Sequence, residues 1–198
     1  FINNDIEVIG PEWLREMVIQ AIRPNVGAVG AKLLYADGTL QHGGVIVGLG
    51  GIACHSHKHL GRHEAGYFCR AQVPQYLSAV TAACLLMRRE CFDEVGRYDE
   101  RNLAVAFNDV DLCLKVRAAG YDIVWTPYAE LYHLESASRG DDMAPEKAAR
   151  FAREIEYMRK RWGDVLDNDP YYSPNLTISS EDFAFGFPSR ARKPWLEN

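Results

Sequence analysis

Hydrophobic and polar positions along the chain alternate between a helical and a strand period. In residues 11–22, apolar side chains recur every three to four positions, which predicts an amphipathic helix. Residues 26–34 form a nearly continuous apolar run, as expected for a buried strand. The Asp-Gly pair at 37–38 then predicts a hairpin turn into another strand at residues 39–47.

The rest of the chain continues this alternation. The expected elements are a buried strand, a short helix, a longer helix, a short strand and an amphipathic helix, at residues 77–87, 89–95, 108–119, 121–126 and 145–162. Gly96, Gly120 and Gly163 follow the helices, where glycine readily takes the left-handed conformation that ends a helix. Pro127 is expected to break the short strand, because proline has no N–H to donate. Helices that alternate with strands predict an α/β fold with a mixed sheet flanked by helices.

Two long stretches show no clear period. Residues 48–76 are rich in glycine and histidine and predict a long surface loop, and loops of that length are usually functional. Residues 164–198 are rich in Asp, Pro, Ser and aromatic residues and are expected to wrap around the surface. Phe1-Ile2 is similar to the end of a buried strand. We therefore expect the chain to be the C-terminal segment of a longer protein.

Composition narrows the class of protein. Hydrophobic residues make up 47% of the 198 positions and charged residues 25%, as in an average globular domain. No apolar run reaches the roughly 18 residues of a membrane-spanning helix. The net charge of −5 argues against a nucleic-acid partner. The 5 cysteines lack the spacing of a zinc or redox motif, which favours free thiols in a reducing, cytoplasmic compartment.

The first candidate for chemistry is the turn Asn3-Asn4-Asp5. It places a carboxylate at the end of the expected N-terminal strand, and α/β folds bind ligands beyond the carboxyl ends of strands. Oxygen ligands of this kind suit magnesium or manganese. Asp5 could instead cap the following helix, and the residues alone favour the cap. His133 lies in a similar strand-end position.

Asp109 and Asp111 fall in the first turn of the helix expected at 108–119, where the helix dipole stabilises negative charge. They point about 200° apart around the helix axis, so only one of them can face a cleft. A single carboxylate there can act as a general base or as a helix cap, a role that Asn108 can also take. The spacing alone favours the cap.

His55, His57 and His59 form a histidine-rich tract in the expected loop. In a strand they would share one face, where zinc accepts imidazole ligands. No carboxylate or thiolate pair completes a structural zinc site at the usual spacing, and a loop that contacts a polar substrate explains the same residues. Both interpretations stay open. The chain has no phosphate-binding P-loop, dinucleotide fingerprint or nucleophile elbow.

Several short motifs occur in a fixed order along residues 1–140. They are Asn3-Asn4-Asp5, Val29–Leu33, Gly43-Gly44, Thr81–Arg89, Phe92–Glu100, Phe107–Lys115, Gly120-Tyr121, Thr126-Pro127 and Leu131–His133. In this order they resemble the family 2 glycosyltransferases, above all the bacterial rhamnosyltransferase-like enzymes that build O-antigen and other polysaccharides. The resemblance implies the GT-A fold. Residues 1–140 would be its acceptor- and metal-binding portion without the preceding nucleotide-binding half, and residues 141–198 the C-terminal helix and tail of the same domain.

The resemblance also implies an inverting, metal-dependent transfer from a nucleotide-sugar donor to a saccharide or lipid-linked acceptor. Asp109 matches the general base of this family, while Asp5 and His133 match ligands of a manganese or magnesium ion on the donor diphosphate. Asn3 and Asn4 are expected to contact the donor. The expected acceptor-binding residues are Thr81, Ala82, Asn108, His55 and His57.

The sequence departs from the family pattern at Asn3, which replaces an acid, and at Asn108, where Glu is commoner. The resemblance places the protein in the cytoplasm, at the inner face of the plasma membrane, with peripheral membrane association. Without the donor half, we expect residues 1–198 to be inactive and to form a homodimer through an exposed sheet edge. The alternative from another class is a non-catalytic carbohydrate-binding or assembly domain.

Overall fold

Two long parallel strands, β2 (Val26–Leu34) and β8 (Asp122–His133), form the centre of the fold. The computed structural model describes residues 1–134, 145–191 and 193–196. Every residue of β2 is buried, which explains its continuous apolar sequence, because a strand covered on both faces carries apolar side chains on both. The prediction of a strand at 26–34 is confirmed.

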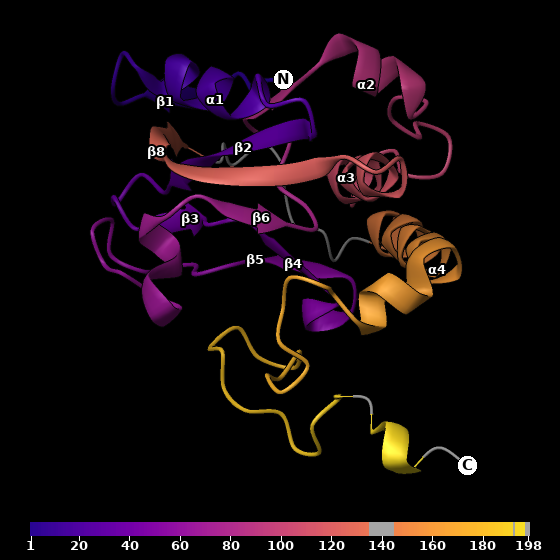
Figure 1. Cartoon of the computed structure of the whole chain (residues 1–198). Helices are drawn as coiled ribbons and strands as arrows, with labels where there is room; N and C mark the ends of the chain where they lie inside the picture. Colours follow the sequence, from indigo (N-terminus) through magenta and orange to yellow (C-terminus); the bar gives the residue numbers. More distant parts are fainter. Residues whose placement is uncertain (135–144, 192, 197–198) are drawn as a thin grey trace.

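Four short strands complete a six-stranded mixed sheet with the order β1-β8-β2-β3, in which β6 also pairs with β8 and β7 with β2 (Figure 1). They are β1 (Ile6–Val8), β3 (Leu40–His42), β6 (Gln75–Leu77) and β7 (Leu85–Met87). Each of the four runs antiparallel to its neighbour. A separate two-stranded sheet consists of β4 (Val45–Val47) and β5 (Ala53–His55). The predicted α/β fold with a mixed sheet is confirmed.

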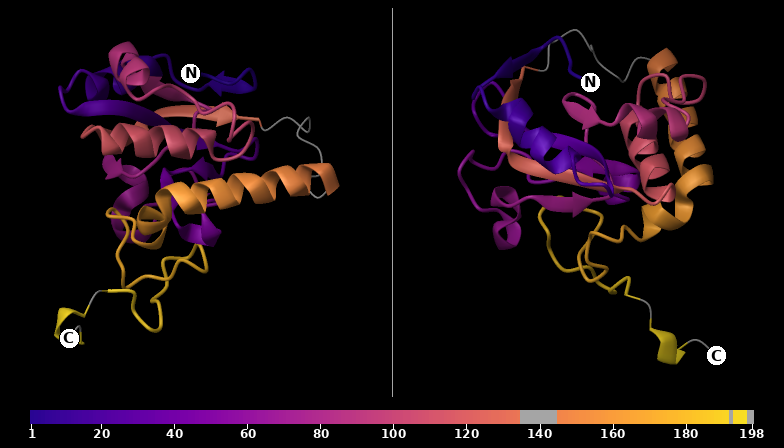
Figure 2. Two further views of the ribbon diagram at one scale, coloured as in Figure 1. Left: turned by 90° about the vertical axis from the view of Figure 1, so that its right-hand side faces the viewer. Right: turned by 45° about the horizontal axis from the view of Figure 1, so that its top comes forward.

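Helices cover both faces of the large sheet (Figure 2). On one face, α1 (Trp13–Ala21) packs Met17 against Val29 and Leu131. On the other, α3 (Asn108–Ala118) and α4 (Pro145–Asp167) pack against Ala28 and Trp125. The adjacent residues Ala28 and Val29 therefore face opposite cores, as the two-residue period of a strand requires.

The remaining helical elements are α2 (Arg89–Glu94) and the 3₁₀ turns η1 (Leu49–Gly51), η2 (Tyr67–Gln72) and η4 (Pro194–Leu196). Gly96 and Gly120 follow α2 and α3 with φ of +82° and +88°, so the predicted glycine stops are confirmed there. Gly163 does not end α4, which continues to Asp167 with non-helical dihedrals at Trp162.

Several predicted boundaries are wrong because contacts distant in sequence decide them. The strand expected at 39–47 divides into β3 and β4, since Gly44 turns the chain with φ of +95°. Only the two ends of the strand expected at 77–87 lie in strands, the first in β6 and the last in β7. β8 continues through Pro127, where a register shift against β2 accommodates the residue without an N–H.

The predicted surface loop at 48–76 is also wrong in part. It contains η1, β5 and η2, and Ile52 and Ala71 within it are buried. The prediction that Phe1-Ile2 is buried fails as well, because these side chains are 51% and 55% exposed.

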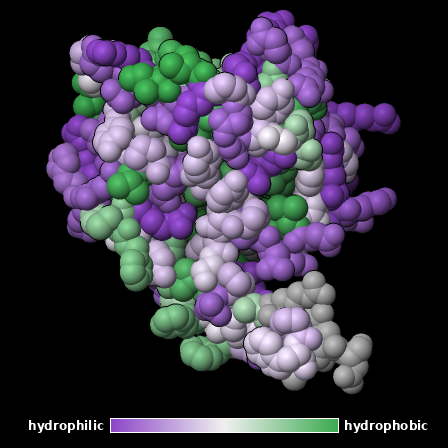
Figure 3. Space-filling model, in the orientation of Figure 1, coloured by the Kyte–Doolittle hydropathy of each residue, from purple (hydrophilic) through white to green (hydrophobic). Residues whose placement is uncertain are grey.

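Residues 168–191 pack against β4 and η1, with Tyr172, Leu176 and Phe183 covering Ile46 and Leu49. Figure 3 shows hydrophobic side chains gathered on the surface over α1, where Leu14, Val18, Ile19 and Ile22 are exposed. None of the helices in the described parts of the chain is long and apolar enough to cross a bilayer.

Candidate active site

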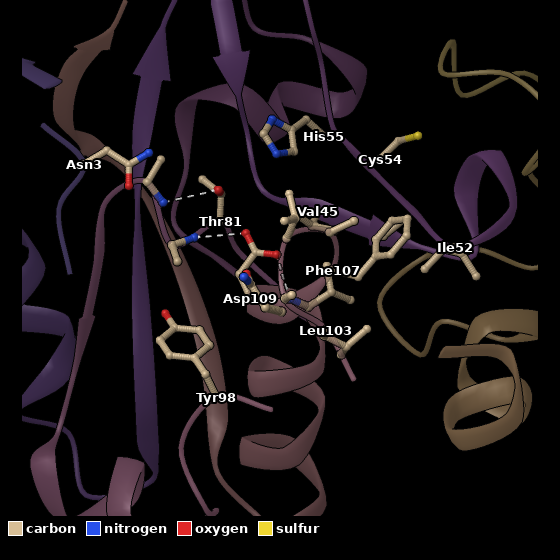
Figure 4. Close-up of a pocket in the computed structure, with 18 of the residues that line it drawn as sticks. Asn3, Val45, Ile52, Cys54, His55, Thr81, Tyr98, Leu103, Phe107 and Asp109 are labelled. Carbon is tan, nitrogen blue, oxygen red and sulfur yellow. Dashed lines mark hydrogen bonds between the residues drawn. The ribbon is translucent and has the colours of Figure 1, made fainter. Parts of the chain in front are cut away.

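A pocket of about 1620 Å³ opens where the N-terminal residues, β5, the start of α3 and α4 meet. It exceeds the roughly 300–1,000 Å³ of a typical small-molecule site, so it has room for more than one ligand. Figure 4 shows lining side chains that converge from several of these segments. The residues that the sequence singled out and that line the pocket are Asn3, Asn4, Asp5, His55, Thr81, Ala82, Asn108, Asp109 and His133.

The Asp109 carboxylate lies at the start of α3 and faces the pocket (Figure 4). Its Oδ2 accepts a hydrogen bond of 3.1 Å from the backbone N–H of Ala82, and its Oδ1 one of 2.9 Å from the N–H of Val110. These two bonds fix the orientation of the carboxylate at the start of the helix. The expected cap by Asn108 or Asp109 is wrong, because the N-cap position is Phe107 and no side chain caps it.

Asp111 points away from the pocket and is fully buried. Its carboxylate accepts a 2.8 Å hydrogen bond from the Trp162 indole and lies 3.3 Å from the charged nitrogens of Lys115 and Arg161. Asp111 therefore ties α3 to α4. The prediction that only one of the two acids can face a cleft is confirmed.

Glu154 of α4 holds the loop that leads into α3. The residue is only 2% exposed, and its two carboxylate oxygens accept hydrogen bonds from the backbone N–H groups of Val105 and Ala106, at 3.0 and 3.2 Å. The next residue, Phe107, has φ of +60°, a strained conformation for a residue with a side chain. Glu154 thus fixes the backbone two residues before Asn108. Sequence reasoning missed it, because nothing in the helical pattern marks which glutamate is buried.

Tyr98 shares the pocket wall with Asp109 (Figure 4). Burial, together with the negative charge of Asp109, raises the pKa of Tyr98 well above its usual value of 10. The phenol therefore remains a neutral hydrogen-bond donor throughout the physiological range.

A second polar group, Asp5 and His133, lines another part of the same pocket. The pairing of β1 with β8 brings these residues together, because Ile6 lies opposite His133 in the register. Asp5 Oδ1 lies 3.3 Å from His133 Nε2, and the Asn3 side-chain nitrogen lies 3.4 Å from the same ring nitrogen.

The donor set of Asp5 and His133 fits a divalent cation that takes its other ligands from phosphate and water. The carboxylate oxygen and the imidazole nitrogen lie within 3.3 Å of each other, and both residues line the pocket. No cluster of three or more His, Cys, Asp or Glu side chains that could hold a metal occurs within residues 1–134, 145–191 and 193–196. The protein alone thus offers two ligands there, which suits manganese or magnesium better than structural zinc.

The histidine tract does not form the predicted strand face. Only His55 belongs to β5 and lines the pocket, whereas His57 and His59 have φ of +60° and +63°. His57 is buried outside the pocket: its Nε2 accepts a 3.2 Å hydrogen bond from the N–H of Tyr67, and its ring lies 4.6 Å from that of Phe183. Burial lowers the pKa of His57 to about 4. The structure therefore separates His57 from the other expected acceptor-binding residues.

His42 escaped sequence reasoning, although it lies directly behind the pocket wall. It is fully buried, its Nε2 accepts a 3.4 Å hydrogen bond from the N–H of Thr81, and its ring centre lies 4.7 Å from that of His55. Burial, and then the proximity of His55 and His133, hold the pKa of His42 well below its usual value. A neutral His42 therefore supports Thr81 without adding charge to the pocket.

No protein-family model matches the chain. The chain is 58% identical over 187 residues to the protein named "Uncharacterized protein y4gI" of Sinorhizobium fredii. The aligned region covers 94% of the chain and 21% of that protein. The chain is also 43% identical over 183 residues to the O-antigen biosynthesis protein RfbC of Myxococcus xanthus. This aligned region covers 92% of the chain and 14% of that protein.

A shorter match concerns the N-acetylglucosaminyl-diphospho-decaprenol L-rhamnosyltransferase of Mycobacterium tuberculosis. It is 40% identical over 70 residues, 35% of the chain and 22% of the enzyme. The chain thus spans about a fifth or less of the length of the curated relatives it matches.

Proposed function

We propose that the chain carries the acceptor side of a glycosyltransferase active site, in an inverting, metal-dependent enzyme of family 2. This enzyme moves a hexosyl or rhamnosyl group from a nucleotide-sugar to a saccharide or lipid-linked acceptor in cell-surface polysaccharide synthesis. The observation that carries the proposal is that the Asp109 carboxylate and the Asp5–His133 pair line one pocket. The names of the relatives, an O-antigen biosynthesis protein and a rhamnosyltransferase, support it.

Asp109 is the general base of the proposed reaction. Its carboxylate takes the proton from an acceptor hydroxyl while that oxygen forms a bond to the anomeric carbon, and the bond from this carbon to the diphosphate breaks. Attack opposite the leaving group inverts the configuration at the anomeric carbon. The hydrogen bond from Ala82 orients the carboxylate, so that the lone pairs left on it face the pocket.

Asp5 and His133 are the proposed ligands of the divalent cation. When bound, manganese or magnesium neutralises charge that develops on the departing diphosphate. Asn3 lies next to His133 Nε2, and Asn4 lines the same part of the pocket, so both can donate amide hydrogen bonds to phosphate or sugar oxygens of the donor.

The acceptor is proposed to lie against Thr81, Ala82, Asn108 and His55, which line the same pocket as Asp109. Beyond these polar groups the wall becomes apolar, and the ring of Phe107 stacks on that of Phe151 with centroids 5.5 Å apart. A polar end beside an apolar wall suits an amphipathic acceptor. A lipid-linked saccharide is such a molecule, and its synthesis would place the enzyme at the inner face of the plasma membrane.

The test is sugar transfer by the protein as its gene encodes it, with a panel of nucleotide-sugars and Mn²⁺. We expect turnover that EDTA abolishes, and a product whose anomeric configuration, read by proton NMR, is opposite to that of the donor. Saccharide affinity that is indifferent to EDTA and to Asp109→Ala, without any turnover, would instead support a non-catalytic carbohydrate-binding domain.

A further inference from the structure

Gln41 of β3 connects two histidines of the pocket. The residue is 2% exposed. Its side-chain nitrogen donates to the backbone oxygen of His133 at 3.3 Å, and its side-chain oxygen lies 2.7 Å from His133 Nδ1. Its backbone oxygen lies 3.1 Å from Nδ1 of His55.

These contacts determine which ring nitrogens carry hydrogen. The backbone oxygen of His133 can only accept, so the amide group of Gln41 that faces it must be the –NH₂. The amide oxygen then faces His133 Nδ1 and can also only accept, so Nδ1 must be a donor. The same reasoning makes His55 Nδ1 a donor to the Gln41 backbone oxygen. In each neutral imidazole the lone pair is therefore on Nε2.

We infer that Gln41 is a positioning residue that holds His133 in the Nδ1–H tautomer, with the Nε2 lone pair directed to the cation site beside Asp5. The inference rests on the proposed function, because the cation is the one that would bind the donor diphosphate. Metal-binding histidines commonly donate their other ring N–H to a carbonyl or carboxylate, which fixes the ring and raises its basicity. Gln41 supplies this contact from a strand that itself does not line the pocket.

The first test is Mn²⁺ binding to the protein as its gene encodes it, in the presence of a nucleoside diphosphate that supplies the remaining ligands. Bound Mn²⁺ is measured by EPR. Gln41→Met keeps the side-chain length but removes both hydrogen bonds, and we expect affinity to fall about 10- to 100-fold. Gln72→Met is the matched control, because the Gln72 side chain also donates to a backbone oxygen, at 2.8 Å from His63 O, but lies outside the pocket. In a His133→Ala background, Gln41→Met should cause no further loss.

The second test reads the tautomer directly by long-range proton–nitrogen NMR of the imidazole rings. Neutral His133 should carry its hydrogen on Nδ1 in the wild-type chain, and Gln41→Met should increase the Nε2–H form. An Nε2–H tautomer in the wild type, or an equal loss of Mn²⁺ affinity with and without His133, would overturn the inference. If the wild type binds no Mn²⁺ in the presence of the nucleoside diphosphate, the proposed function fails, and the tautomer measurement still tests the role of Gln41.

Discussion

The backbone N–H of Ala82 donates a 3.1 Å hydrogen bond to Oδ2 of Asp109, a residue 27 positions further along the chain. This bond joins the segment between β6 and β7 to the first turn of α3. The bond restricts the orientation of the carboxylate, and a general base must be held in hydrogen-bond reach of the hydroxyl that it deprotonates. The contact holds the carboxylate at the wall of the pocket, where the proposed general base would meet the acceptor hydroxyl.

The buried Glu154 should position Asp109 from a distance. In Glu154→Gln, one of the two N–H groups of Val105 and Ala106 would face an amide –NH₂. We expect the free energy of unfolding to fall by about 1–3 kcal/mol, the usual cost of a lost hydrogen bond to a buried charge. Turnover should fall while the Michaelis constants change little, because the loop entering α3 loses its anchor. The exposed Glu156→Gln is the control for both denaturation and kinetics.

Gly30 should tolerate no side chain. A Cβ built there lies 2.5 Å from Cβ of the core residue Val80, whereas at Gly10 no atom lies within 4 Å. We expect Gly30→Ala to destabilise the fold by about 1–3 kcal/mol through overpacking, and Gly10→Ala to be nearly neutral. Urea denaturation of the two variants measures the difference. Equal midpoints would show that the sheet relaxes around the added methyl group.

His57 should make the stability of the fold depend on pH. Its pKa of about 4 in the folded state lies below the ordinary 6.5, so the unfolded chain binds more protons between these values. Stability should therefore decrease as the pH falls from about 6.5 towards 4, by up to about 3 kcal/mol from this residue. His57→Gln should reduce the pH dependence of the unfolding free energy and leave the part that comes from the buried His42. The exposed His63→Gln should leave the pH dependence unchanged.

Asp5 should matter for the diphosphate only when the metal is present. We expect Asp5→Asn to weaken calorimetric binding of nucleoside diphosphates in Mn²⁺ more than His133→Ala does, because the carboxylate contributes charge as well as a ligand. Glu7→Gln, an exposed acid two positions away, is the control. Equal affinity with Mn²⁺ and with EDTA would contradict a metal at this place.

The sequence predicts the parts of the fold that depend on local pattern. The strand at 26–34 has the bounds of β2, and the helix at 108–119 ends within one residue of α3, because an unbroken apolar run and a glycine stop are local signals. β8 escaped prediction beyond Pro127, since its second half is defined by pairing with β1 and β2. No pattern within the strand itself carries that information.

The residues of the candidate site, too, could be predicted from the sequence only in part. Motif order brought Asp5, Asp109 and His133 to attention, and the structure gathers them around one pocket. The local sequence does not separate His57 from His55. His57 is buried because Phe183, 126 positions further along the chain, packs against its ring. Gln41 and Glu154 act through hydrogen bonds to residues 92 and 48–49 positions away, so their roles become visible only in three dimensions.

The most direct test of the account is Asp109→Asn in the protein as its gene encodes it, with the surface variant Asp93→Asn as control. We expect turnover to fall by orders of magnitude while affinity for the nucleotide-sugar stays within a few-fold, since a general base acts in the transition state and not in donor binding. Sugar transfer by Asp109→Asn at the rate of the Asp93→Asn control would show that the carboxylate merely stabilises the start of α3, and would contradict the central claim.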